Sequence, residues 1–441
     1  MNDWIERQFK LKERRTDIRT EVTAGVTTFM TMAYIIFINP DILSKAGMPF
    51  GALMVSTCLA AAISTFMMAF FANYPVALAP GMGLNAFFTF TVVIGMKVPW
   101  QSALTAVFVE GIIFIILTFT KIRENVVNGI PLSLKHGISA GIGLFIAFIG
   151  FQNGGFTIVS DATLVTGAGL RGNIQPILTL FGLVFICTLE ALRVKGAILW
   201  GIIATTAAAV LTGAAKIPTA IVSMPPSIAP IFAKLDFSLL SFDLSGRAIA
   251  TFWTIVFTFF FVDFFDTVGT LVGVANRAGL LDENGKLPKA REALFADAIG
   301  TTVGAVLGVS TVTSYVESTS GIGVGGRTGL TSLVTGVLFM LAIFFNPLIS
   351  VVPACATAPA LIFVGIYMIM NIKNLDFSDW TEALPAVMAI FAMPFTYSIA
   401  SGIEYGFITY VAVKLTSGRA RDVSPIMFAL AVIFLAKELF L

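Results

Sequence analysis

The chain has 441 residues, of which 57% are hydrophobic and only 12% are charged, and its mean hydropathy is +0.92. A soluble domain normally carries about a quarter charged residues, so this composition excludes a soluble protein and indicates an all-α polytopic membrane protein surrounded by lipid. The formal net charge of +2 gives no reason to expect a nucleic-acid partner.

Apolar windows near the length that crosses a bilayer core, about 20 residues, recur along the whole chain. We place fourteen of them, several of them short, at residues 21–40, 50–72, 82–95, 101–120, 136–151, 175–192, 197–213, 250–274, 292–309, 315–325, 328–346, 354–371, 383–397 and 401–415. A further apolar stretch, 424–440, is compatible with another span or with a helix lying in the membrane interface. The first window lacks a small-residue cleavage site, so we expect it to stay in the mature protein.

Lysine and arginine gather on one side of the membrane if the fourteen windows alternate in direction. They lie in residues 7–19, 121–135, 193–195, 277–291, 373 and 414–421. Basic loops face the cytoplasm, which predicts a cytoplasmic N-terminus and a multi-pass protein of the cell membrane. The longest connector on the opposite side, 214–247, divides the chain into a first half, 1–235, and a second half, 236–441.

Two windows at corresponding places in the halves are interrupted by helix-breaking residues. The third contains APGMGLN (79–85), and the tenth contains VSTVTSYVESTSGIGVGGRTG (309–329). Non-helical backbone persists at membrane depth only where protein or a water-filled cavity satisfies it. Seven spans per half reverse the second half relative to the first, and paired interrupted segments in such an inverted repeat indicate a mid-membrane binding site. Asn85 and Glu317 are then at matching positions.

The eighth window carries two acids, Asp263 and Asp266, among aromatic and aliphatic residues. On a helix they share one face with Thr267 and Thr270, where two ionised carboxylates would repel each other unless one is protonated or reaches water. Intramembrane acids are rare and are usually functional. The alternative is that they only cap a broken helix or tie helices together, and Asn85 is also compatible with a role between helices.

The remaining polar residues indicate less. Glu110 and Glu190 lie in continuous helical windows, and we give them little weight as site residues. His136, the only histidine, is predicted to lie at the interface. The three cysteines have no pair spacing, so we expect neither a metal site, nor a cofactor, nor a disulfide framework.

Four stretches together resemble one known family. They are TAGVTTFMTMAYIIFINP (23–40), ALAPGMGLNAFF (77–88), FFDTVGTLVGVANRAGL (264–280) and SYVESTSGIGVGGRTGLT (314–331). Their order and length are similar to those of the AzgA-type purine permeases, the branch of the nucleobase:cation symporters that carries adenine, guanine and hypoxanthine. The resemblance runs over nearly the whole chain.

This resemblance implies a fold of fourteen spans in a seven-plus-seven inverted repeat. Spans 1–4 and 8–11 form a core domain, and spans 5–7 and 12–14 form a gate domain. In such proteins the third and tenth spans begin with short extended β-segments, which here would be residues 76–79 and 310–313. Relatives of this kind form dimers, so a homodimer is compatible with the resemblance.

The resemblance also assigns roles to single residues. Asn85, Asp263 and Glu317 correspond to the substrate-binding residues, and Asp266 corresponds to a further essential acid. In the related uracil and xanthine branches, the eighth-span acid is Glu and is followed one turn later by His. Asp263 and Thr267 stand at these places here, which argues against uracil or xanthine as the substrate.

The mechanism that we expect is proton-driven import of purine bases by alternating access. The acids can accept hydrogen bonds from purine N–H groups, and the amide of Asn85 can both donate and accept. Thr267 adds a hydroxyl, while Phe87, Phe88 and Phe264 are candidates to stack on the flat base. The coupling proton would bind to one of the three acids, 263, 266 or 317.

Three rival functions stay open from sequence. One is sodium-coupled nucleobase transport, for which carboxylates and the hydroxyls of residues 310–314 could hold the ion. Another is an anion transporter or channel of the same architecture, which predicts a basic or neutral centre where this chain has acids. The third is a membrane-embedded enzyme, which no metal-ligand cluster or nucleophile–base pair supports.

Overall fold

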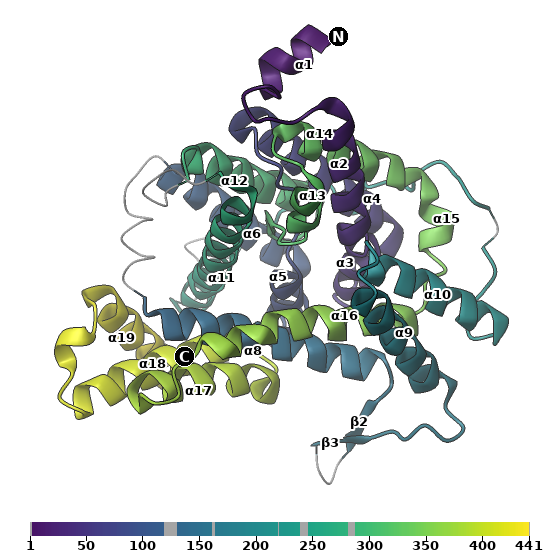
Figure 1. The fold of residues 1–441 in the computed structure, drawn as a ribbon. Helices are drawn as coiled ribbons and strands as arrows, with labels where there is room; N and C mark the ends of the chain where they lie inside the picture. The colour runs from purple at the N-terminus through teal and green to yellow at the C-terminus, as the bar shows by residue number, and fades with distance from the viewer. Residues whose placement is uncertain are drawn as a thin grey trace.

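The computed structural model describes residues 2–118, 130–160, 164–218, 220–238, 246–280 and 287–440. Long helices make up most of it (Figure 1). The helices are α1 (Asn2–Phe9), α2 (Ile18–Met32), α3 (Ile35–Ser44), α4 (Phe50–Met67), η1 (Met68–Ala72), α5 (Met82–Ala86), η2 (Phe87–Gly95), α6 (Trp100–Thr118), α8 (Leu132–Asn153), α9 (Ile174–Ala191), α10 (Ala197–Leu211), α11 (Gly246–Ala278), α12 (Ala290–Leu307), α13 (Ser318–Val324), α14 (Gly329–Ala342), η4 (Ile343–Phe345), α15 (Asn346–Ile349), α16 (Ala354–Ile369), η5 (Met370–Asn374), α17 (Trp380–Thr396), α18 (Ile399–Thr416), η6 (Ala420–Asp422) and α19 (Pro425–Phe440).

Seven helical segments in the described part of the chain are long and apolar enough to cross a membrane. They are Ile18–Ser44, Phe50–Ala72, Trp100–Thr118, Leu132–Asn153, Ile174–Ala191, Gly329–Ile349 and Ala354–Asn374. Shorter apolar helices, among them Met82–Gly95 and Ala197–Leu211, lie between them. The expectation of a polytopic membrane protein is thus confirmed, while the count of fourteen spans stays a prediction.

The helices pack in two groups. In the first, α2, α3, α4, α6, α11, α12, α13 and α14 contact one another, and in the second, α8, α9, α10, α16, α17, α18 and α19 do so. Figure 1 shows α2, α4, α12 and α14 in the upper part of the molecule and α8, α16, α17 and α18 across the lower part. We name these the core group and the gate group after the domains that the resemblance implies. A division into domains that move stays a prediction.

Helices α2 and α3 form one apolar window that the structure divides. The break lies at residues 33–34, where the sequence predicts a continuous span. Threonine hydroxyls donate to carbonyls one turn back along α2, as Thr27 does to Thr23 at 2.8 Å and Thr31 to Thr28 at 2.9 Å. Such back-bonding weakens and bends helices. The break places Tyr34 at the centre of the core group.

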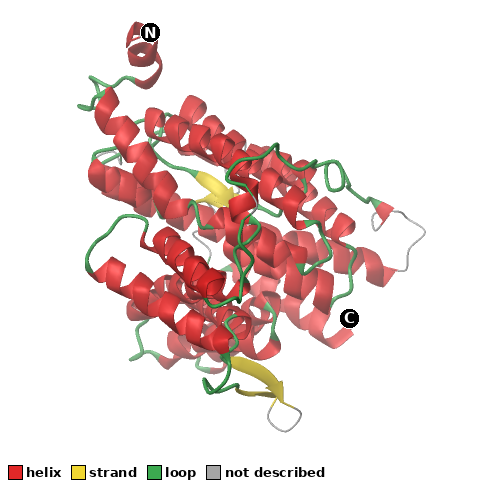
Figure 2. Cartoon of the chain, turned by 90° about the vertical axis from the view of Figure 1, so that its right-hand side faces the viewer, coloured by secondary structure: helices red, strands yellow, loops and turns green. Residues whose placement is uncertain are grey.

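Two short strands cross the middle of the core group (Figure 2). Strand β1 (Leu78–Pro80) pairs antiparallel with β4 (Val312–Ser314), so that Leu78 is opposite Ser314 and Pro80 is opposite Val312. Each strand begins two residues later and ends one residue later than the extended segment implied by the resemblance. Helix α5 follows β1 and continues as the π-helix η2, a form that often marks functional sites.

A second hairpin lies outside the helices and was missed by the all-α expectation. Strand β2 (Thr157–Ser160) pairs antiparallel with β3 (Leu164–Gly167) after the end of α8. Figure 2 shows it projecting from one end of the molecule. Its runs TIVS and LVTG are rich in β-branched residues, which fit a strand better than a helix.

Candidate functional site

The paired strands bring the two broken windows together, and their backbone is satisfied by the neighbouring chain. Gly81 N–H donates to the Thr311 carbonyl at 3.0 Å, and Ala77 N–H donates to the Ser318 hydroxyl at 3.0 Å. The Tyr315 hydroxyl donates to the Pro80 carbonyl at 2.6 Å. Irregular backbone inside a membrane requires such partners. The strand pair is therefore a fixed frame on which the polar side chains are placed.

Glu317 immediately precedes α13 and is half-buried. The Tyr34 hydroxyl donates a hydrogen bond to Glu317 Oε1 from the break between α2 and α3. The adjacent Val316 is 55% exposed, so the chain around the carboxyl is not sealed within the core group. A carboxyl held on one oxygen and open on one side is suited to bind a ligand that presents N–H groups.

Asn85, in α5, is completely buried. The Ser310 hydroxyl donates to Asn85 Oδ1, whereas Asn85 Nδ2 has no hydrogen-bond partner among the described residues. An unmade hydrogen bond at a buried amide is costly, so this group is suited to a ligand. Both predicted residues therefore lie at one segment, residues 310–314. Asn85 is bonded to Ser310 at the start of the segment, and Glu317 follows just beyond its end.

The two acids of α11 have different surroundings. Asp263 is fully buried, and the Thr267 hydroxyl lies 3.2 Å from Asp263 Oδ1 and 2.8 Å from the Thr313 hydroxyl. Asp266 is half-buried, within reach of Thr313 and of the charge on Glu317. Asp266 therefore belongs beside Glu317, while Asp263 and Thr267 extend into the core group. Thr313 of β4 lies within hydrogen-bonding reach of both Asp266 and Thr267, at the point where the two surroundings meet.

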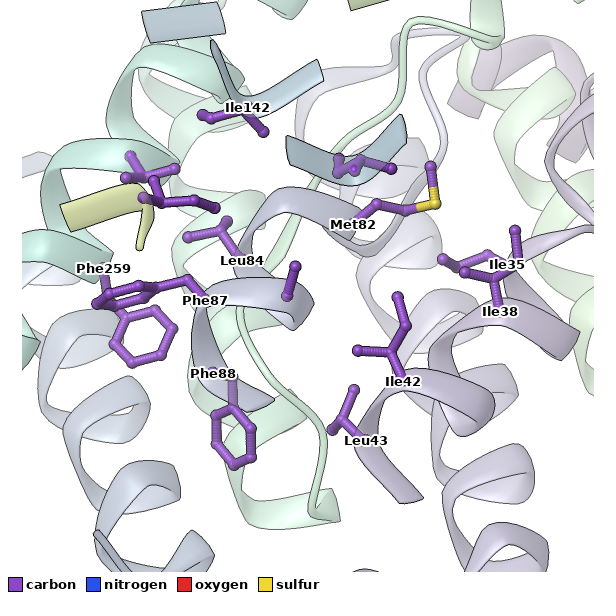
Figure 3. Packing of buried hydrophobic residues seen from close by; sticks show 14 of the residues in the cluster. Ile35, Ile38, Ile42, Leu43, Met82, Leu84, Phe87, Phe88, Ile142 and Phe259 are labelled. Atoms are coloured by element: carbon purple, nitrogen blue, oxygen red, sulfur yellow. The ribbon is translucent and has the colours of Figure 1, made fainter. Parts of the chain in front are cut away.

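The aromatic residues proposed to stack on a base are packed against protein. Phe87 is fully buried, with its ring 4.8 Å from that of Phe259 in an edge-to-face arrangement, as Figure 3 shows. Phe264 lies in a separate cluster with Phe114 and Ala298, between α6, α11 and α12. This position gives Phe264 a packing role, so we leave it out of the proposed substrate site. Phe87 stays a candidate only through its place next to Asn85.

Three polar residues next to the predicted set were not anticipated from the sequence. Tyr34 holds Glu317, and Asp297 of α12 lies 3.1 Å from the Thr267 hydroxyl. Glu110, which the sequence analysis gave little weight, is fully buried in α6 and accepts a hydrogen bond from the Thr311 hydroxyl at 2.8 Å. A carboxylate inside an apolar window could have indicated Glu110 from the sequence. It was given little weight because the window around it is a continuous helix without breaks.

A membrane-embedded helical fold with two broken segments paired at its centre, surrounded by acids and an amide, defines a transporter. Comparison of the sequence with known protein families identifies the family. Residues 19–405 match the model of the xanthine/uracil permeases, described as a permease family, and the chain belongs to this family. Its members are permeases, so the enzyme alternative is excluded and the family resemblance is confirmed.

Relatives are similar over nearly their full length. The adenine permease AdeP of Escherichia coli is 44% identical over 437 residues, which cover 99% of this chain and 96% of that protein. The guanine/hypoxanthine permease PbuG of Bacillus subtilis is 44% identical over 442 residues, covering 98% of this chain and 99% of that protein.

The fold is also similar to that of a solved transporter. The transmembrane domain of the cyanobacterial bicarbonate transporter BicA gives a TM-score of 0.66 at 16% identity, over 87% of this chain and 97% of that domain. At this identity the likeness shows the fold alone.

Proposed function

We propose that this permease imports purine bases (adenine, hypoxanthine and guanine) by proton symport and alternating access. The observation that carries the proposal is the pairing of Glu317 and Asn85 on one central segment, each with hydrogen-bonding capacity left over. The edges of a purine present both donors and acceptors, which a carboxyl and an amide match. The names of the relatives, adenine permease and guanine/hypoxanthine permease, support the same substrate class.

The coupling proton is proposed to bind within the set of acids around the strand pair. Asp266 and Glu317 are half-buried and near each other, and Asp263 lies one turn away on α11. Two carboxylates close together in a poorly solvated site resist being ionised at once. A proton on one of them would relieve the repulsion. Its release on the other side of the membrane would allow the empty carrier to return to its starting state.

Alternating access is proposed as movement of the core group against the gate group. The Lys45 ammonium, at the end of α3, donates to Asn153 Oδ1 at the end of α8 at 2.6 Å. The Tyr397 hydroxyl donates to Gln152 at 2.8 Å, and its ring lies 5.6 Å from that of Phe90 in η2. Two of these contacts, Lys45 with Asn153 and the ring of Tyr397 with that of Phe90, join the two groups on one side. With fourteen spans and a cytoplasmic N-terminus, both of which belong to the proposal, that side faces outward. A homodimer in the cell membrane is part of the same proposal.

The test is uptake of radiolabelled adenine and hypoxanthine into proteoliposomes with and without an inward pH gradient. Glu317→Gln should abolish accumulation, because it removes the charge that accepts the ligand and the titratable group together. Glu190→Gln is the matched control, since Glu190 is exposed on α9 and accepts a hydrogen bond from the Tyr367 hydroxyl at 2.7 Å. If neither base accumulates under any ion gradient, the purine assignment is wrong.

Sodium coupling is the alternative that the same assay separates. A sodium gradient that drives accumulation without a pH gradient would replace the proton by sodium as the coupling ion. An anion as substrate is disfavoured, because the residues gathered at the strand pair are acids and an amide.

A further inference from the structure

A group of buried acids lies beside the strand pair and is reached through Thr311 and Thr313. Glu110 of α6, Asp263 of α11 and Asp297 of α12 are each at most 1% exposed. The Thr267 hydroxyl links two of them, at 3.2 Å from Asp263 Oδ1 and 3.1 Å from Asp297 Oδ2. Buried carboxylates cost several kcal/mol each unless they are neutralised or fully hydrogen-bonded.

Glu110 is incompletely satisfied. Its Oε2 accepts a hydrogen bond from the Thr311 hydroxyl at 2.8 Å, while Oε1 has no hydrogen-bond partner among the described residues. The carboxyl lies within electrostatic range of Asp297. An unpartnered carboxylate oxygen next to a second acid is a place for a proton, which would supply the missing donor and remove one of the two charges.

The elements packed against Glu110 present acids rather than bases. Helix α12 presents Asp297, whose charge acts on Glu110, and Asp263 of α11 lies next to Thr267. The π-helix η2, FFTFTVVIG, contains no titratable residue. Arg291 and Glu292 lie exposed at the start of α12, more than a helical turn before Asp297. The charged groups that face Glu110 therefore favour the uptake of a positive charge.

This acid cluster is connected to the substrate site through alternate residues of one segment. The Thr311 hydroxyl contacts Glu110, and the Thr313 hydroxyl contacts Thr267. Just before them in the chain, Ser310 contacts Asn85. Ser310 and Thr311 are neighbours in the chain, so a single peptide unit joins the contact with the substrate amide to the contact with Glu110.

We propose that Glu110 and Asp297 form a second, buried proton-binding site that holds the transported proton, separate from the substrate-binding residues. The inference rests on the proposed proton-coupled function and moves the proton from the substrate acids to this pair. Protonation forms an O–H bond at Glu110 Oε1 with a proton from water on one side of the membrane. The same bond breaks when the proton returns to water on the other side.

The experiment separates coupling from substrate exchange in proteoliposomes of the full chain. Counterflow, in which labelled adenine outside exchanges for unlabelled adenine inside, needs no ion gradient. Accumulation under an inward pH gradient, together with adenine-dependent acidification of a trapped pH dye, reports coupling. Glu110→Gln keeps the size of the side chain and an acceptor for Thr311 but cannot titrate. Glu190→Gln serves as the control for a glutamate on another helix.

We expect Glu110→Gln to keep counterflow within about twofold of the wild type while accumulation and acidification fall to background. Asp297→Asn should likewise keep counterflow and lose accumulation and acidification. It carries the test if Glu110→Gln does not fold. The proposal is overturned if Glu110→Gln still accumulates adenine and takes up protons, or if counterflow is lost along with accumulation. A wild type without adenine counterflow would instead refute the proposed function, and accumulation driven by sodium alone would refute the proton assignment.

Discussion

Replacing Glu21 tests how the half-helix that carries Glu317 is held in place. Glu21 lies in α2 and is completely buried. Its Oε1 accepts from the Arg327 N–H at 2.8 Å, and its Oε2 accepts from the Thr331 hydroxyl at 2.6 Å and the Thr331 N–H at 3.2 Å. The Thr328 N–H adds a longer bond at 3.3 Å. These N–H groups belong to the start of α14, where a helix cannot satisfy its own donors.

The cost of two substitutions follows from these bonds. In Glu21→Gln, an amide oxygen at the Oε2 position keeps the three bonds to residues 328 and 331, so the Arg327 N–H alone loses its acceptor. A buried donor left without a partner costs about 1–3 kcal/mol. In Glu21→Ala, all the donors lose their acceptor and a cavity is added. We expect a loss of about 4 kcal/mol or more in the free energy of unfolding, which is the upper range for one substitution.

The assay is denaturant unfolding of the purified protein in detergent micelles. Glu13→Gln is the control, because Glu13 is an exposed residue whose 3.0 Å ion pair with Lys10 is also exposed. We expect it to change the free energy of unfolding by less than about 0.5 kcal/mol. If Glu21→Ala costs no more than this control, Glu21 does not hold the α13–α14 junction and the reasoning is wrong.

Three further changes test packing, movement and pH dependence. The Lys45 and Asn153 side chains bond at 2.6 Å between the two helix groups, so cysteines at both positions should be joined by a bifunctional methanethiosulfonate linker that spans the length of the lost lysine side chain, and uptake should stop until the linker is reduced; uptake by the cross-linked protein would contradict movement there. An added Cβ at Gly321 would lie 2.2 Å from a threonine hydroxyl of α2, so Gly321→Val should lose the folded peak on size-exclusion chromatography, whereas Gly323→Val, with open space around it, should keep it. Hydrogen bonds from the threonine two residues on lower the pKa of Asp379 from 3.8 to about 2. Its contribution to stability is therefore present above pH 3.8 and is lost as the pH falls toward 2; melting curves of Asp379→Asn should lack this loss.

The broken windows show how far sequence reasoning reaches. Glycine, proline and hydroxyl residues in an apolar chain indicate backbone that cannot be an ordinary spanning helix. That argument, with the resemblance, indicated segments 76–79 and 310–313, and the structure has strands within two residues of both. Local composition alone indicates the two broken windows, 79–85 and 309–329, whereas the bounds of the extended segments came from the resemblance.

The contacts that complete the site depend on tertiary structure and could not be deduced in this way. Tyr34 and Glu317 are 283 residues apart, and Glu110 and Thr311 are 201 residues apart. No periodicity within one window reports such a pairing. The π-helix at Phe87 is also undetectable from spacing, because its residues are apolar and fit an α-helix equally well. Helical spacing did group Asp263 with Asp266, but it could not show that Asp266 lies near Glu317 while Thr267 contacts both Asp263 and Asp297.

The non-helical residues between α12 and β4 place two neighbouring side chains against different partners. Ser310 contacts Asn85, while Thr311, the next residue, contacts Glu110. A shift of this segment after a proton binds at Glu110 would move the hydroxyl that holds Asn85 as well. The two sites are linked through a single peptide unit, which is the shortest connection by which a proton can alter the affinity for a base.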